Sequence, residues 1–399
     1  MNLSISKRVS LISPSLTLAI TAKAKQMKQE GIDVIGFGAG EPDFDIPVHI
    51  KEAAKKAMDE GFTKYTPASG IKELKEAICK KFKTDNNLDY SPREIFVSCG
   101  AKHSIFNTIL ALCNKDDEVI LPSPYWLGYL EMIRIAEAKS VILKTTQENS
   151  FKIKPWQLQK LITSKTKLLI LNSPSNPTGM VYTKPELFFI RKILVEKRVF
   201  CLSDEIYEKI IYDGQKHISI ASLDPDIKRL TIVVNGFSQT YSMPGWRIGY
   251  AAGQKEIIEA MGNVQRHSTS HPTYISQKAA LAALEGPQNN VANMITEFDK
   301  RRNYIIKRLN FMNGIFCLLP VGTFYVFPDF SLIIGETFKG EVIKDTAFLA
   351  EILLREANVR VMPGFVFGAD DNLRLSYTTS MENIIEGLNR IEEFVNNII

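Results

Sequence analysis

Four short segments of the chain place residues that could bind a charged or polar ligand next to apolar runs. In Ser98–Ser104, small residues lead from a predicted strand into a predicted helix, where backbone N–H groups and the Lys102 ammonium suit a phosphate. Taken alone, this segment is more typical of an ordinary strand–helix turn, and His103 is more typical of a capping or packing residue. Another of the four segments, Asn235–Tyr250, contains Arg247. Its guanidinium fork matches phosphate oxygens, although a structural pair with a carboxylate would also explain this arginine.

Two of these segments place polar groups at the ends of predicted strands. Asn172–Gly179 contains two prolines and a glycine, which fix the loop so that Asn176 presents its amide from a rigid position. This much polar chemistry at a strand end indicates binding. Asp204 follows the apolar run Val199–Ser203, and a buried acid is costly unless a cation or donor pairs with it. A protonated ring nitrogen would meet that need, and so would the N-terminus of the next helix.

The elements that must position these side chains alternate between short β-branched runs and longer helical patterns, such as His103–Leu112 and Pro185–Glu196. Several of the runs are apolar at consecutive positions, which is typical of strands that helices cover on both faces. The alternation predicts an α/β fold with a mostly parallel, doubly wound sheet, whose strand ends hold the ligand. Its expected strands are Glu94–Ser98, Glu118–Leu121, Ser140–Lys144, Lys167–Asn172, Val199–Ser203, Leu230–Asn235 and Ile248–Ala252.

The two chain ends are predicted to form a second, smaller α+β domain, because 399 residues are too many for one ordinary core. After about residue 288 the alternating pattern gives way to a long charged helix, about Asn293–Asn310, and finally to an amphipathic helix, Ser380–Val395. We expect residues 46–287 to form the large ligand-binding domain and residues 1–45 and 288–399 to form the small one.

Composition and charge exclude several classes of function. The net charge of +5 comes from 49 basic and 44 acidic side chains without a dense basic block, so no nucleic-acid partner is expected. The five cysteines show no C-x-x-C pair and no ligand-like spacing with histidine, which predicts buried thiols, a reducing compartment and no metal site. With no signal-peptide pattern and no apolar stretch of membrane-spanning length, we expect a cytoplasmic protein without a membrane partner. A nucleotide-dependent enzyme would need a P-loop or a G-x-G-x-x-G after the first strand, and neither is found.

Six segments together resemble, in order and across essentially the full length, the fold-type I aminotransferases, which use pyridoxal 5′-phosphate (PLP). The resemblance is nearest to the aspartate/prephenate aminotransferase branch, class I subgroup beta. It implies the aspartate aminotransferase fold, with a seven-stranded sheet in the large domain. The segments are Gly38–Asp45, Lys64–Pro67, Ser123–Trp126, Asn176–Gly179, Ser203–Tyr207 and Gly245–Tyr250.

This resemblance implies that PLP or pyridoxamine 5′-phosphate (PMP) is the cofactor and suggests its contacts. Asp204 would pair with the pyridine nitrogen and keep it protonated, so that the ring acts as an electron sink. Asn176 and Tyr207 would hydrogen-bond the phenolic oxygen, and Trp126 would stack on the ring. Tyr65 would reach the phosphate of the neighbouring subunit, which implies a homodimer with two shared active sites. The other residues implied in the phosphate region are Ala101, Lys102, Ser238 and Arg247.

The same resemblance suggests the substrate contacts. Arg374 would form a bidentate clamp on the substrate α-carboxylate. Lys102 and Thr17 would help to hold a distal carboxylate, which favours aspartate or glutamate as amino donor and a 2-oxo acid as acceptor. Some relatives that accept prephenate carry a basic residue where this chain has Ser13, so prephenate is less expected. The remaining substrate contacts implied are Gly40, Trp126 and Asn176.

Gln239 stands where the resemblance places the catalytic lysine that forms a Schiff base with PLP. That lysine holds the cofactor and moves a proton between the substrate Cα and the cofactor C4′. A glutamine amide is neither nucleophilic nor usefully basic. Because a general base contributes roughly 10²–10⁴-fold, the chain is predicted to bind PLP or PMP noncovalently and to turn over very slowly.

Three explanations of Gln239 stay open. The first is an engineered lysine-to-glutamine variant of an active aminotransferase, which the otherwise complete set of site residues favours. The second is a natural lysine-less homologue that acts on PMP, or a pseudoenzyme that depends on a partner subunit for the lysine. The third is a non-enzymatic binding or regulatory protein, which a DNA-binding extension would favour, and the sequence shows no such extension.

Overall fold

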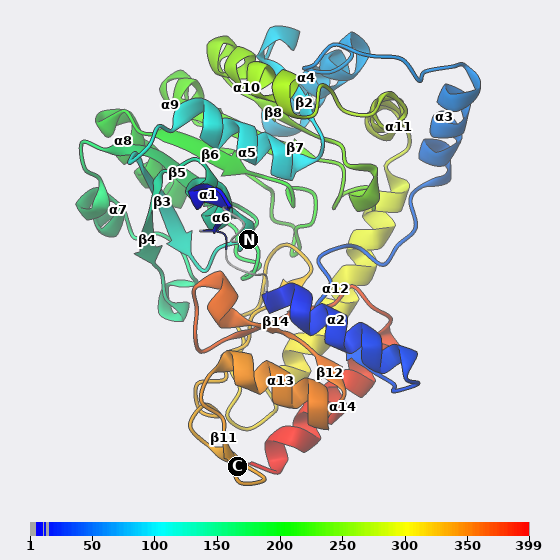
Figure 1. Cartoon of the computed structure of the whole chain (residues 1–399), viewed down its shortest axis with the longest axis vertical. Helices are drawn as coiled ribbons and strands as arrows, with labels where there is room; N and C mark the ends of the chain where they lie inside the picture. Colours follow the sequence, from blue (N-terminus) through cyan, green and yellow to red (C-terminus); the bar gives the residue numbers. More distant parts are fainter. Residues whose placement is uncertain (1–4, 11, 13–15, 399) are drawn as a thin grey trace.

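The computed structural model describes residues 5–10, 12 and 16–398, with Lys7 and residues 16–19 described by their backbone alone. Its main feature is a seven-stranded sheet with the strand order β2-β8-β7-β6-β5-β3-β4 (Figure 1). Only β8 runs antiparallel to its neighbours. The predicted α/β class and mostly parallel sheet are therefore confirmed, and each expected strand overlaps an observed one. The strands are β2 Ile95–Ser98, β3 Glu118–Ser123, β4 Lys139–Lys144, β5 Thr166–Asn172, β6 Phe200–Asp204, β7 Thr231–Gly236 and β8 Gly249–Ala252.

Helices cover both faces of this sheet, which explains why its strands are apolar at consecutive positions. In β5, Leu168 and Ile170 pack with α5, α6 and α10 on one face, whereas Leu169 and Leu171 pack with α7 and α8 on the other. α3, α4 and α11 cover the β2 edge. The helices are α3 Val48–Asp59, α4 Lys72–Asn86, α5 Ala101–Leu112, α6 Gly128–Ile135, α7 Pro155–Leu161, α8 Lys184–Lys197, α9 Pro225–Leu230, α10 Lys255–Ser268 and α11 Tyr274–Glu285.

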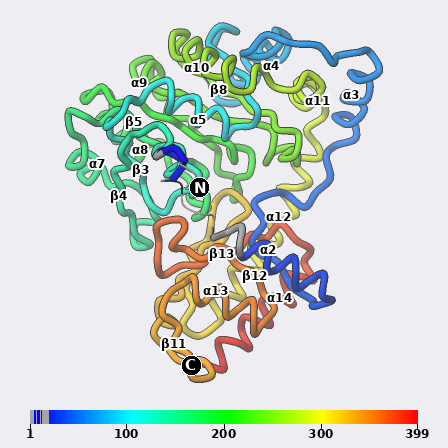
Figure 2. Tube along the Cα trace, viewed as in Figure 1, coloured from blue at the N-terminus to red at the C-terminus, as the bar shows by residue number. Residues whose placement is uncertain are grey.

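Residues 16–36 and the C-terminal part of the chain lie together below the large sheet, as Figures 1 and 2 show. Strand β1 (Ile35–Gly36) pairs in parallel with β12 (Val359–Arg360), so a segment near the N-terminus joins one near the C-terminus. The predicted domain limits, 1–45 with 288–399 against 46–287, stay a prediction. The other elements here are α2 Leu16–Gln29, α12 Asn289–Leu309, β9 Tyr325–Val326, β10 Thr337–Phe338, β11 Glu341–Val342, α13 Thr346–Glu356, β13 Met362–Pro363, β14 Leu373–Ser376 and α14 Met381–Asn396. The short helix α1 (Lys7–Ser10) lies instead beside α6 of the large sheet.

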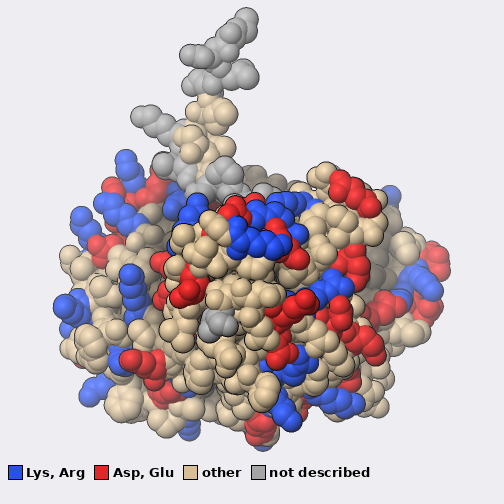
Figure 3. Space-filling model, turned by 90° about the horizontal axis from the view of Figure 1, so that it is seen from below, with Lys and Arg blue, Asp and Glu red and all other residues tan. Residues whose placement is uncertain are grey.

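Thiols and surface charge agree with the sequence in most respects. All five cysteines lie in the described part of the chain and are free; Cys113, Cys201 and Cys317 are buried, whereas Cys79 and Cys99 are only half-buried. Acidic and basic side chains are interspersed over the face that Figure 3 shows. Among the described residues, no helix is both long and apolar enough to cross a bilayer.

Candidate active site

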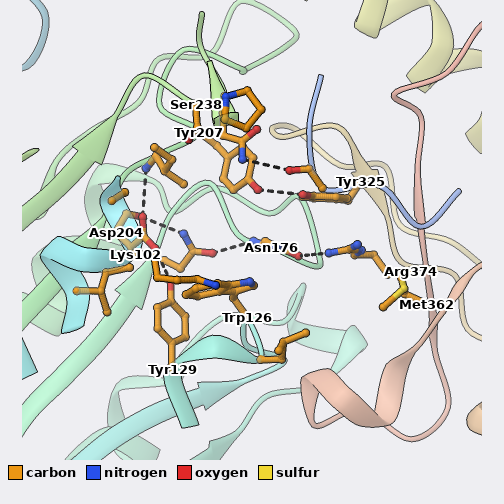
Figure 4. Close-up of a pocket in the computed structure, with 18 of the residues that line it drawn as sticks. Lys102, Trp126, Tyr129, Asn176, Asp204, Tyr207, Ser238, Tyr325, Met362 and Arg374 are labelled. Atoms are coloured by element: carbon orange, nitrogen blue, oxygen red, sulfur yellow. Dashed lines mark hydrogen bonds between the residues drawn. The ribbon is translucent and has the colours of Figure 1, made fainter. Parts of the chain in front are cut away.

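A cavity of about 590 Å³ opens at the carboxyl ends of β5, β6 and β7, where the large sheet meets residues 38–40 and strands β13 and β14 (Figure 4). Parallel sheets bind ligands at this edge, because loops after several strands converge there. The structure brings eleven of the predicted site residues together around this one cavity. They are Gly40, Ala101, Lys102, Trp126, Asn176, Asp204, Tyr207, Ser238, Gln239, Arg247 and Arg374.

Positive charge gathers at the end of the cavity where α5 begins. Gly100, at φ +88°, is the residue before this helix, and a Cβ there would lie 2.5 Å from Nη2 of Arg247. Arg247 is held by a hydrogen bond of 2.7 Å from its Nη1 to the carbonyl of Pro244. Burial, with the charge of Arg247 as a second cause, lowers the pKa of Lys102. A helix N-terminus with two such cations suits a phosphate dianion.

Asp204 supplies the negative charge of the cavity. Its carboxylate is buried and accepts hydrogen bonds from Tyr129 Oη at 2.6 Å and from the backbone N–H of Ile206 at 3.3 Å. Burial raises the pKa of Asp204 from 3.8 to about 6, and these two hydrogen bonds act against that rise. Asp204 is the only acid among the described residues that line the cavity. Its buried carboxylate is therefore suited to a protonated ring nitrogen.

The opposite wall carries Arg374 on β14. Its Nη1 donates to Oδ1 of Asn176 at 3.1 Å and its Nη2 to the carbonyl of Gly38 at 3.1 Å, while Nε has no partner among the described residues. The loop before Asn176 is fixed by Asn172, whose Oδ1 accepts from the backbone N–H of Asn176 at 2.8 Å. Tyr325, which sequence reasoning missed, lies under the Arg374 guanidinium at 4.4 Å from the ring centroid. Arg374 thus has no carboxylate partner among the described residues, and its guanidinium can bind the carboxylate of a ligand.

Gln239 reaches the cavity from the loop after β7. Its Nε2 donates to the carbonyl of Gly40 at 3.2 Å. Its Oε1 is buried and finds no hydrogen-bond partner among the described residues. A buried acceptor without a donor is costly, so the folded chain pays a penalty at this oxygen.

Tyr65 does not line the cavity, and the side chains of Thr17 and Ser13 lie outside the described part of the chain. Tyr65 is 91% exposed and touches His271 edge to face, with ring centroids 5.6 Å apart. Thr17 lies in the first turn of α2, but its side chain is outside the described part of the chain, as is Ser13 altogether. Thr21, one helical turn after Thr17, does line the cavity.

Several other lining residues lie in no motif of the sequence, because their roles depend on tertiary contacts. Tyr129 was missed although it bonds Asp204, and Tyr325 although its hydroxyl lies 2.9 Å from that of Tyr207. Met362 also lines the cavity. Gly38, Asn172 and Ile206 line the cavity too, and they do lie in segments named above, Gly38–Asp45, Asn172–Gly179 and Ser203–Tyr207.

Behind Asp204, a buried cluster holds Glu205, Glu208 and His217, with one ligand atom of each within 4.8 Å of the others. Protein groups already serve these carboxylates. His217 Nε2 lies 2.8 Å from Glu205, Asn86 donates to Glu208 at 2.8 Å, and the Lys81 ammonium pairs with Glu208. Burial by itself would raise the pKa of Glu208, but Lys81, His217 and Asn86 bring it down to about 2. The Lys81 ammonium supplies the cation that this cluster needs.

The structure is an α/β fold whose cavity combines two cations at the start of α5 with one buried carboxylate. A model of the family "Aminotransferase class I and II" matches residues 32–391. The chain is 47% identical to an aspartate aminotransferase of Bacillus subtilis (strain 168) over 98% of each chain. The chain belongs to the class I and II aminotransferases, whose members of the aspartate aminotransferase type use PLP as cofactor.

Solved structures agree with this assignment. An aspartate aminotransferase from Rhizobium meliloti superposes with a TM-score of 0.97, at 40% identity and over 100% of both chains. An aspartate aminotransferase from Thermus thermophilus with maleate superposes with a TM-score of 0.91, at 40% identity, over 98% of this chain and 100% of the other. The likeness therefore extends over both the large sheet and the region formed by the chain ends.

Proposed function

We propose that this cavity binds PLP or PMP without a covalent bond, in an aminotransferase site where Gln239 takes the place of the cofactor-anchoring lysine. The substrates are an acidic L-amino acid, aspartate or glutamate, and a 2-oxo acid. One observation carries this proposal: Asp204, Arg374 and Gln239 line the same cavity.

The lining residues fit the cofactor by charge and by donor chemistry. The Asp204 carboxylate would pair with the ring nitrogen, Asn176 and Tyr207 would hydrogen-bond the phenolic oxygen, and Trp126 would cover the ring face. When bound, the cofactor supplies an electron sink for the electron pair left when the substrate Cα–H bond breaks. The phosphate would be held at the start of α5, by Ala101, Lys102, Ser238 and Arg247.

Two cations support an acidic substrate. Arg374 is buried, holds two neutral acceptors and lacks a carboxylate, so it suits the substrate α-carboxylate. The Lys102 ammonium lies over the Trp126 ring, 5.0 Å from its centroid, and is placed for a distal carboxylate, with Thr17 as its expected helper. All three relatives described above are aspartate aminotransferases by name.

Gln239 limits what the site can do. Its amide cannot form a bond to the cofactor aldehyde and cannot carry a proton from the substrate Cα. Cofactor binding depends on the other residues, so we expect it to persist while turnover is very slow. An engineered lysine-to-glutamine change would have this effect.

A second candidate is a natural lysine-less homologue that holds PMP, or a pseudoenzyme that depends on a partner subunit. Gln239 favours PMP specifically, because the amine of PMP can donate a hydrogen bond to an amide oxygen and the aldehyde of PLP cannot. A preference for PMP over PLP in binding would support this candidate.

The proposed binding is tested by titrating the cofactor-free chain with PLP and with PMP and following protein fluorescence. Both should bind, and Arg247→Gln should weaken both by roughly 10–100-fold, since hydrogen bonds to charged groups contribute about 1.5–3 kcal/mol. Arg198→Gln, at the exposed end of α8, removes the same charge elsewhere and should change nothing. Absence of binding by the unmodified chain would reject the proposal.

We also propose a homodimer in which Tyr65 reaches the phosphate of the partner subunit. Its 91% exposure in one chain supports this, because a large aromatic side chain that exposed is suited to contact a second subunit. Light scattering should give twice the chain mass of 45.0 kDa. Tyr65→Phe should have the same mass in solution and should bind PMP more weakly than the unmodified chain. A monomeric unmodified chain, or a Tyr65→Phe variant with unchanged PMP affinity, would contradict the shared site.

A further inference from the structure

Arg360, at the end of β12, carries a charge that no carboxylate balances. It is half-buried, and its Nε is fully enclosed without a hydrogen-bond partner among the described residues. Every Asp and Glu of the chain lies in the described part. The buried arginines Arg301 and Arg302, by contrast, both form ion pairs, with Asp43 at 2.9 Å and with Asp213 at 2.7 Å. An enclosed guanidinium without an anion is costly, so its presence requires another explanation.

The side chain of Arg360 lies against Gly38, a residue that lines the cavity, although Arg360 is not itself among the lining residues. Val359 and Val361 point into the core, and the two-residue period of extended chain places Arg360 on the same side as Met362, which lines the cavity. A Cβ on Gly38 would lie 2.5 Å from Nε of Arg360 and 2.7 Å from its Nη2. The guanidinium therefore rests directly against Gly38, itself a lining residue.

Arg374 flanks the same glycine. Its Nη2 donates to the Gly38 carbonyl at 3.1 Å, so both guanidinium groups lie against Gly38. Burial, and then the charge of Arg374, lowers the pKa of Arg360, as expected for two like charges that share no anion. Neither arginine forms an ion pair within the described residues, and both Nε atoms lack partners.

We propose that Arg360 is a specificity-determining residue, which joins Arg374 in a two-cation site for one carboxylate of the acidic substrate. The inference rests on the proposed function, because the carboxylate is that of the amino acid or 2-oxo acid. A carboxylate bound near Gly38 would reduce the repulsion between the two guanidinium groups. The enclosed charge of Arg360 thus costs stability in the free chain and contributes affinity in the complex.

The test uses maleate, an unreactive dicarboxylate, and the full-length chain loaded with PLP. Calorimetry should show Arg360→Gln binding maleate about tenfold more weakly than the unmodified chain, the size expected for a lost charge-assisted hydrogen bond. Arg198→Gln, which removes an exposed charge at the end of α8, is the matched control and should bind maleate normally. Arg360→Lys keeps the charge without the fork, should show intermediate affinity, and serves as the test if the Gln variant does not fold.

Thermal stability separates this role from a structural one. Without maleate, Arg360→Gln should melt no lower than the unmodified chain, because the change removes an unpaired enclosed charge. A lower melting temperature with unchanged maleate affinity would overturn the inference and assign Arg360 to structure. Equal affinity at equal stability would also overturn it, while leaving the proposed cofactor and substrate site intact. If the unmodified chain binds PLP but not maleate, the acidic-substrate proposal and this inference both fail.

Discussion

Replacing Gln239 with lysine should raise the rate of transamination of L-aspartate by roughly 10²–10⁴-fold, the usual contribution of a general base. The amine would restore two functions that the amide lacks: covalent attachment of PLP and transfer of the Cα proton. The cavity residues that would bind cofactor and substrate are already gathered around position 239. Formation of the 2-oxo acid product in a coupled assay, with excess PLP and a second 2-oxo acid as acceptor, measures the gain.

Gln239→Met is the matched control for this experiment. Its unbranched side chain fills similar space and supplies no amine, so its rate should stay with that of the unmodified chain. A lysine variant that binds PLP yet remains as slow as the methionine variant would mean that the cavity is not arranged for transamination. The third explanation of Gln239, a non-enzymatic binding protein, would then be favoured.

Asp204→Asn, made in the Gln239→Lys chain, should lower the transamination rate by roughly 10²–10³-fold, the effect of removing one preoriented electrostatic contact in a water-excluded site. The amide cannot hold a proton on the ring nitrogen as a carboxylate does, so the electron sink is lost. Steady-state kinetics with saturating cofactor measures the loss. A variant that keeps its rate would place the ring nitrogen away from Asp204.

The pH dependence of PMP binding gives this second prediction a further measure. Because burial raises the pKa of Asp204 to about 6, cofactor affinity should be greatest above pH 6 and fall below it as the carboxyl takes up a proton. The hydrogen bond from Tyr129 lowers that pKa, so Tyr129→Phe should move the fall to higher pH. A profile that does not move would contradict the role given to Tyr129.

The contribution of Asp204 to the folding stability of the cofactor-free chain should fall as pH rises, whereas cofactor affinity should increase. The folded chain holds the proton of Asp204 more tightly than the unfolded chain, so this group costs stability progressively as pH rises from 3.8 to about 6. Asp204→Asn should therefore make the cofactor-free chain no less stable at neutral pH, although it binds the cofactor more weakly. Stability given up at a binding residue is typical of functional sites.

The large sheet could be predicted from the sequence, because strands covered on both faces show as consecutive apolar residues, as in Leu168–Leu171 of β5. Site residues on recognisable segments, such as Asn176 and Asp204, could be predicted through the resemblance. Tyr129 and Tyr325 could not, because a lone tyrosine in an apolar segment shows no sign of the acid or hydroxyl that it will meet. The pairing of β1 with β12 joins residues more than 300 positions apart, and neither two-residue strand has a pattern of its own.

The role proposed for Arg360 could not be predicted from the sequence either. In the sequence, Arg360 is an ordinary polar residue between apolar ones. Only the fold shows that no carboxylate pairs with it. Unpaired charge is a property of three-dimensional contacts. For that reason, the structure adds most to the sequence around Gly38, where Arg360 and Arg374 lie.

The most direct test of the role of Gln239 is the intact mass of the PLP-loaded chain after reduction with borohydride, which makes any imine bond permanent. The mass of the unmodified chain should not change, whereas Gln239→Lys should gain one reduced cofactor, located at residue 239 by peptide mapping. A cofactor fixed to the unmodified chain, for example at Lys102, whose pKa burial lowers, would contradict noncovalent binding and the loss of the anchoring amine.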